Sequence, residues 1–156
     1  PPPAGKKEML GMQYANSETP TVTVGGQEYQ IQLVYADNGS STDKALTAAT
    51  QLVSEGVSLV LGSYGSGVSI AAGPTFGNAG LPAIGVQPAP TPWSPPAIDY
   101  YFRICFLDPF QGTVLANFAM EKFQAKTAYL LGEAGNEYDQ GLINFFEQAF
   151  TAAGAP

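Results

Sequence analysis

Apolar and polar positions along the chain follow two alternating periods, one typical of strands and one typical of helices. Short apolar runs separate longer segments in which apolar residues recur every three or four positions. The expected helices are 8–16, 40–54, 68–78, 109–122 and 138–153, and the expected strands are 21–24, 29–35, 57–61, 82–86, 100–106 and 125–131. This alternation predicts an α/β fold in which helices cover doubly wound parallel sheets.

Two connections in this pattern have a distinctive composition. Gly25 and Gly26 separate the first two expected strands, and a glycine pair suits the tight primed turn of a β-hairpin. Residues 87–98 are rich in proline, which is excluded from helix and sheet interiors. We therefore expect an irregular but ordered loop there.

Composition removes several classes of function. The 156 residues carry a formal net charge of -7, which argues against nucleic acid as a partner. With no histidine and a single cysteine, the chain has no Cys/His zinc set, no internal disulfide and no Ser-His-Asp or Cys-His machinery. Cys105 lies in an apolar run and is expected to be a small buried hydrophobe. We predict no catalytic residue, no metal site and no cofactor.

The strongest candidate site is the glycine-rich segment 62–67, between the strand expected at 57–61 and the helix that follows. Glycines let backbone N–H groups point outward, and a helix start carries partial positive charge, so such a turn binds phosphate or carboxylate. The spacing Gly-x-x-Gly-x-Gly departs from the dinucleotide fingerprint, and no Walker lysine follows. Gly65, Ser66 and Gly67 are the central candidates. The alternative is a tight turn without a ligand, with Ser66 acting only as a helix cap.

Other candidates follow the ends of neighbouring strands. Ligands of open α/β sheets bind outside the carboxyl ends of the strands. Gln87, Ala89 and Thr91 follow the strand expected at 82–86, and Tyr138 follows the one at 125–131. Tyr64 is placed to stack on a ligand, as is Trp93, although either side chain could simply cover a loop. For Tyr138 the alternative is packing on the sheet.

Taken together, these stretches resemble the type I periplasmic binding proteins of the leucine/isoleucine/valine receptor group. The resemblance covers most of the chain in the same element order. It is carried by YQIQLVYAD (29–37), GSYGSGVSIAAGPTFGNAG (62–80), YFRICFLDPFQG (101–112) and YDQGLINFFEQAFTAAG (138–154).

The resemblance implies two doubly wound lobes that close on a ligand like a clamp. Residues 1–106 would form lobe one, and 107–156 would begin lobe two. In such proteins the serine matching Ser66 receives the ligand's α-carboxylate, and Tyr138 matches the tyrosine of the second lobe. Ala89 stands where the family usually has a threonine, which puts a standard amino-acid ligand in question, although Thr91 lies close by. The family's acidic residue for the ligand ammonium falls beyond Pro156.

The family's first strand has no counterpart before the helix expected at 8–16. In that topology the strand lies inside the first sheet, so its loss would leave unpaired edges. We therefore expect the sequence to be a fragment lacking the first strand and most of lobe two, with the missing strand supplied by the rest of the chain or by another chain.

The implied function is capture of an amino acid or a related small carboxylate or amide for an ABC importer. Its partners would be that ligand and the transporter permease, in the periplasm or outside the cell, with or without a lipid anchor. Two alternatives stay open: a regulatory ligand sensor of the same fold, and a nucleotide-using α/β enzyme, which the missing histidine and scarce basic residues disfavour.

Overall fold

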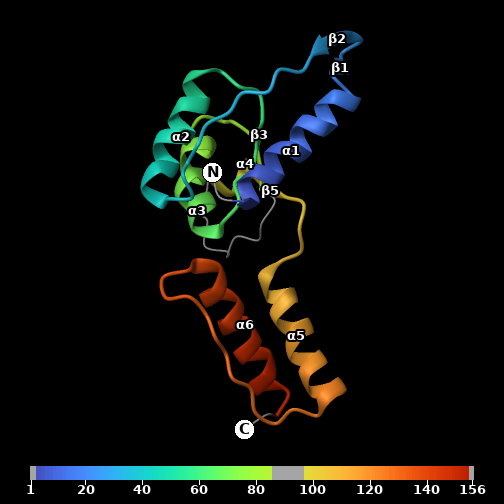
Figure 1. Cartoon of the computed structure of the whole chain (residues 1–156), viewed down its shortest axis with the longest axis vertical. Coiled ribbons are helices and arrows are strands. Elements are labelled where there is room, and N and C mark those ends of the chain that lie inside the picture. The colour runs from blue at the N-terminus through green and yellow to red at the C-terminus, as the bar shows by residue number, and fades with distance from the viewer. Residues whose placement is uncertain (1–2, 86–96, 155–156) are drawn as a thin grey trace.

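The computed structural model describes residues 3–85 and 97–154. The strands and the first four helices gather in one part of the molecule, and the two C-terminal helices form the other (Figure 1). The helices are α1 (Pro3–Glu18), α2 (Thr42–Ser54), α3 (Ser66–Asn78), α4 (Ala97–Tyr100), α5 (Asp108–Phe123) and α6 (Glu137–Ala152). The strands are β1 (Thr21–Val24), β2 (Gln27–Gln30), β3 (Val60–Leu61), β4 (Ala83–Gly85) and β5 (Tyr101–Arg103).

The hairpin forms around its glycine pair. β1 and β2 are antiparallel, and Val24 is paired with Gln27 across the turn. Gly25 and Gly26 have φ values of 59° and 84°, the double positive φ of a type I′ turn. The expected length of the second strand, 29–35, is wrong. β2 ends at Gln30 because β1 offers only four residues to pair with, and no described strand lies beside residues 31–38.

After this hairpin, the chain forms a three-stranded parallel sheet with the strand order β3-β4-β5. Its strands occupy the apolar runs expected at 57–61, 82–86 and 100–106, but each is only two or three residues long. β3 has a single neighbour among the described strands, so little of its run can join a ladder. Gly85 is required in β4 because the Tyr101 side chain lies directly against its α-carbon.

The main core lies where α2 and α3 pack on each other and on this sheet. It consists of Ala45, Ala49, Val60, Val68, Ala72, Phe76, Leu81 and Ala83. Val68, Ala72 and Phe76 follow one another at helical spacing on the buried face of α3. The buried face of α2 is formed by small alanines that let α3 approach closely, and Leu46, which is 56% exposed, lies outside it.

Helices α5 and α6 lie side by side and run in the same direction, because the chain between them returns along the pair (Figure 1). A Cβ built on Gly112 of α5 would lie 2.6 Å from Cβ of Phe145 in α6, so the two helices meet at backbone distance there. Ala116 and Phe150 are buried in the same contact. None of the described helices is long and apolar enough to cross a membrane.

The strand expected at 125–131 is absent. This segment has no regular secondary structure, and Tyr129 and Leu131 are 90% and 86% exposed. A strand needs a partner for its backbone hydrogen bonds, and the described strands all lie elsewhere. Residues 125–131 therefore have the sequence pattern of a strand but no described strand to pair with.

Helix boundaries also differ from expectation. α1 extends beyond 8–16 at both ends, and α3 begins at Ser66, two residues before the expected start. Ser41 occupies the position before α2, but its side chain makes no cap hydrogen bond.

Candidate functional site

The glycine turn stands at the carboxyl end of β3 and leads directly into α3. Its start is fixed to the sheet by a hydrogen bond of 2.9 Å from the N–H of Gly62 to the carbonyl of Ile84. Gly65 caps α3 with φ 102° and ψ 122°, a conformation that side-chain-bearing residues rarely adopt. The first N–H groups of α3 have no partner inside the helix, so the turn presents donors at a positive helix end.

Three serines surround these donors. Ser66 is the first residue of α3 and is only 3% exposed. Ser69, one turn later, is 2% exposed, and its hydroxyl lies 3.0 Å from the hydroxyl of Ser63. Ser69 therefore holds the turn to the helix, whereas Ser66 stands at the helix start where an anion would dock. Tyr64, between them in the turn, is 46% exposed.

The start of α6 lies against the start of α3. A Cβ built on Gly67 would lie 3.5 Å from the Thr42 methyl group and 3.7 Å from Cγ of Glu137. Figure 1 shows the end of α6 that carries Glu137 and Tyr138 next to the first turn of α3. The structure thus brings the helix of Tyr138 to the Ser66 turn, although the two residues are far apart in sequence.

Local hydrogen bonds position Tyr138. The side chain of Asn136 accepts bonds from the N–H groups of Tyr138 and Asp139, at 3.1 and 3.3 Å, and so caps α6. The Tyr138 hydroxyl bonds the side chain of Gln111 in α5, at 3.0 and 3.3 Å. Its orientation is therefore set by α5. The other predicted site residues, Gln87, Ala89 and Thr91, lie outside the described residues, as does Trp93.

Sequence analysis missed an acidic residue at this turn. The carboxylate of Glu8, in α1, lies near the backbone N–H of Tyr64. Its Oε1 atom is buried and has no hydrogen-bond partner. Burial raises the pKa of Glu8, and the Tyr64 N–H opposes that shift. No sequence signal links two residues separated by a hairpin and a helix, so only the folded chain reveals this contact.

Tyr101 of β5 lies near the same carboxylate. Burial raises the pKa of its phenol, the Ser69 side chain and the charge of Arg103 lower it, and the charges of Cys105 and Glu8 raise it further. Glu8, Ser69 and Tyr101 thus act on one another from three elements, α1, α3 and β5.

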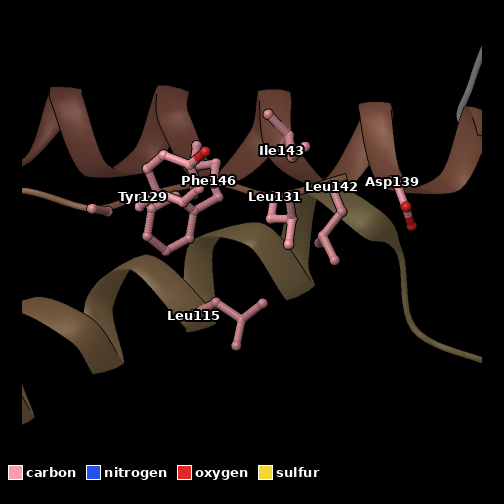
Figure 2. A pocket seen from close by; sticks show the side chains of 9 residues that line it. Leu115, Tyr129, Leu131, Asp139, Leu142, Ile143 and Phe146 are labelled. Atoms are coloured by element: carbon pink, nitrogen blue, oxygen red, sulfur yellow. The ribbon is translucent and has the colours of Figure 1, made fainter. Parts of the chain in front are cut away.

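Two cavities in the described part of the chain lie away from the turn. The larger, about 340 Å³, is formed by α5, α6 and residues 128–131. Figure 2 shows it lined mainly by apolar side chains, among them Leu115, Leu131 and Phe146. The second, about 320 Å³, lies between the C-terminal ends of α2 and α3. Neither is lined by a predicted site residue.

Asp108 precedes Pro109, a position that suits the N-terminal cap of a helix, but it does not cap α5. Leu107 holds the cap position, and Asp108 is the first residue of the helix. Its side chain is fully buried, and neither carboxylate oxygen has a hydrogen-bond partner. Burial raises the pKa of Asp108, and the positive charge of Arg103 opposes that shift.

Replacing Asp108 with asparagine is expected to stabilise the protein more at neutral than at acidic pH. The folded-state pKa is raised, so the native state holds its proton more tightly than the unfolded chain. Wild-type stability is therefore highest below the ordinary pKa and falls as pH rises through the raised value. The gain in unfolding free energy should reach about 1 kcal/mol near pH 7 and vanish near pH 4. Denaturant unfolding at both values measures it.

Asp43 supplies the control, since it is exposed in the first turn of α2. Asp43→Asn should lower the unfolding free energy by about 0.3 kcal/mol, because it removes a negative charge that interacts favourably with the helix dipole. A destabilised Asp108→Asn protein at neutral pH would show that the ionised carboxylate is well paired in the native state.

Comparison with known proteins agrees with this architecture. The periplasmic binding protein family matches residues 8–156. The solved structure of leucine binding protein LivK from Thermotoga maritima MSB8 superposes with a TM-score of 0.82 and 32% identity, covering 97% of this chain and 42% of that one. LivJ from Streptococcus pneumoniae, a branched-chain amino acid transporter substrate binding protein, was solved with isoleucine. It superposes with a TM-score of 0.72 and 31% identity, covering 93% of this chain and 40% of that one.

A curated relative is Leu/Ile/Val-binding protein homolog 3 of Brucella melitensis biotype 1, 24% identical over 129 residues, which are 80% of this chain and 34% of that protein. The chain thus spans about a third of this relative's length.

The chain belongs to the periplasmic binding protein family. Within it, the chain has the type I fold and groups with the branched-chain amino acid receptors, as the resemblance implied. These relatives are ligand-binding proteins.

Proposed function

We propose that this protein is the solute-binding component of an ABC importer and that it captures an amino acid at the Ser66 turn. The observation that carries the proposal is the start of α3, with a glycine cap at Gly65 and a buried serine at Ser66, at the carboxyl end of a parallel sheet. The first N–H groups of a helix have no partner within the helix itself. The 31% identity to a structure that holds isoleucine supports the amino-acid ligand.

In this proposal the ligand's α-carboxylate occupies the start of α3. The N–H groups of the first turn and the Ser66 hydroxyl would donate to it, because hydrogen bonds to a charged acceptor are shorter and stronger than neutral ones. Gly65, Gly67 and Tyr64 shape the approach. We propose Gln87, Ala89 and Thr91 as further contacts.

Access requires a hinge motion. Ser66 is 3% exposed and the start of α6 lies over the first turn of α3, so we propose that a ligand enters when the α5–α6 pair swings away. The segment 104–107, between β5 and α5, would act as the hinge between lobes 1–106 and 107–156. Tyr138 would close on the ligand from the second lobe.

The remaining parts of the proposal follow from the class of protein. The protein would act in the periplasm or outside the cell, deliver its ligand to a transporter permease, and catalyse no reaction. The working form would be a two-lobed chain of about the length of the relatives, in which further strands complete both sheets.

A thermal-shift screen of the full-length protein tests the function. Leucine, isoleucine, valine and other amino acids should raise the melting temperature, because a ligand that binds only the native state stabilises it by mass action. At a thousandfold excess over Kd the gain is about 4 kcal/mol, a shift of several degrees. Stabilisation by nucleotides with none by amino acids would contradict the proposal.

A further inference from the structure

The turn at residues 37–40, just before α2, contains two hydrogen bonds from the backbone to side chains. The Asp37 carboxylate accepts a hydrogen bond of 2.8 Å from the N–H of Gly39. The side-chain carbonyl of Asn38 accepts one of 2.9 Å from the N–H of Ser40. Asp37, Gly39 and Ser40 are exposed and Asn38 is half-buried, so water reaches this turn.

Asn38 and Gly39 form the only Asn-Gly pair in the sequence. The backbone nitrogen after an asparagine can attack the side-chain amide carbon, and a glycine there has no Cβ to shield it. An asparagine side chain that bonds the N–H two residues further on folds over the peptide between them. The bond to Ser40 therefore brings Cγ of Asn38 next to the nitrogen of Gly39.

The two hydrogen bonds act on the two groups that would react. Asp37 holds the proton of the attacking Gly39 nitrogen, as a positioned general base does. The N–H of Ser40 polarises the Asn38 carbonyl and would stabilise negative charge on its oxygen, as an oxyanion donor does. The native turn thus supplies both forms of assistance to the formation of one bond.

We propose that Asn38 is a site of spontaneous covalent modification, at which the native turn promotes conversion of the asparagine to aspartate and isoaspartate. The Gly39 nitrogen bonds to Cγ of Asn38 while Asp37 takes up its proton. The bond from Cγ to the side-chain nitrogen then breaks, and that nitrogen leaves as ammonia with the proton from Asp37. Water opens the resulting cyclic succinimide at either carbonyl.

The modification changes the segment that leads into α2. Each conversion adds a negative charge, and isoaspartate also inserts a methylene group into the main chain. The backbone carbonyl of Asn38 accepts the N–H of Ser41 at 3.0 Å, which an altered main chain would disturb. Thr42, the next residue, lies against Gly67 at the start of α3. The modified residue therefore belongs to the segment that positions Thr42 beside the Ser66 turn.

Timed incubation of the native full-length protein at mildly alkaline pH, followed by peptide mapping with mass spectrometry, measures conversion at each asparagine. Asn38 should gain one dalton, with an isoaspartate isomer, at least tenfold faster than Asn136. Asn136 is the matched control because its side chain also accepts backbone N–H groups, although Glu137 follows it in place of a glycine.

The variant Asp37→Asn keeps an acceptor for the N–H of Gly39 but removes the base. It should slow conversion of Asn38 in the native protein by at least about fivefold, less than a well-positioned base gives in an enzyme. In denaturant the turn is lost, so the wild type and Asp37→Asn should convert Asn38 at nearly the same rate.

Three results would overturn the proposal. The first is native wild-type protein in which Asn38 converts no faster than Asn136. The second is an equal native rate in the wild type and Asp37→Asn. The third is an effect of Asp37→Asn that is as large in denaturant as in the native protein, because the local sequence alone would then account for the reaction.

Discussion

Replacing Gly112 with alanine is expected to cost about 3 kcal/mol of unfolding free energy, the upper end of overpacking effects. The added methyl group would lie 2.8 Å from the carbonyl carbon of Phe145 and the nitrogen of Phe146. These are backbone atoms of α6, which cannot turn aside as a side chain could. Helices α5 and α6 would have to separate at this point, and Ala116 and Phe150 would lose burial.

Gly11 gives a matched control in α1. It is also a glycine inside a helix, but a Cβ there meets nothing within 4 Å. Gly11→Ala should therefore stabilise the protein by up to about 1 kcal/mol through helix propensity alone. Denaturant unfolding of both variants measures the difference. Similar midpoints for the two would mean that the close contact between α5 and α6 is not formed.

Replacing Ser66 with alanine is expected to weaken amino-acid binding by about ten- to a hundredfold. The proposed contact is a hydroxyl donor to a carboxylate, and hydrogen bonds to charged groups are worth about 1.5–3 kcal/mol, where about 1.4 kcal/mol is tenfold in affinity. The ligand carboxylate would keep its helix N–H donors but lose the side-chain donor. Titration calorimetry with leucine measures the change.

Ser69 is the control because it is equally buried and lies one turn further along α3. Its hydroxyl contacts Ser63 at 3.0 Å, so Ser69→Ala should lower the unfolding free energy by about 1 kcal/mol. Ser69→Ala should change the affinity for leucine by less than about threefold, which is a small change in binding free energy. A larger loss of binding in Ser69→Ala than in Ser66→Ala would move the ligand contact away from the helix start.

The sequence pattern predicted the elements that depend on local periodicity and local turns. The hairpin at Gly25 and Gly26, the α2–α3 core and the long apolar helix α6 all appear where expected. These features need only neighbouring residues: paired positive φ angles for the turn, and apolar residues three or four apart for the helices. The parallel pairing of β3, β4 and β5 followed from the same alternation.

Strand lengths were not predictable in the same way. Residues 31–35 and 125–131 have strand-like patterns, yet neither segment is a strand. A strand exists only beside a partner, and that partner is a property of the whole fold rather than of the segment. The whole chain covers 42% of the length of LivK, which agrees with the expectation of a longer two-lobed protein.

The candidate site was only partly accessible to sequence reasoning. The glycine turn and Ser66 have a local signature, a strand followed by glycines and a helix. Glu8 and Glu137 have none, because each reaches the turn through tertiary packing. For Asp108 the local sequence was misleading. Its position before Pro109 suits a helix cap, but its side chain is buried and does not cap α5.

A crystal structure of the full-length protein with bound leucine tests the central claim most directly. The account predicts the leucine carboxylate about 2.7–3.2 Å from the Ser66 hydroxyl oxygen and from N–H groups in the first turn of α3. Leucine bound instead in the apolar cavity between α5 and α6, with the α3 start contacting only protein atoms, would contradict it.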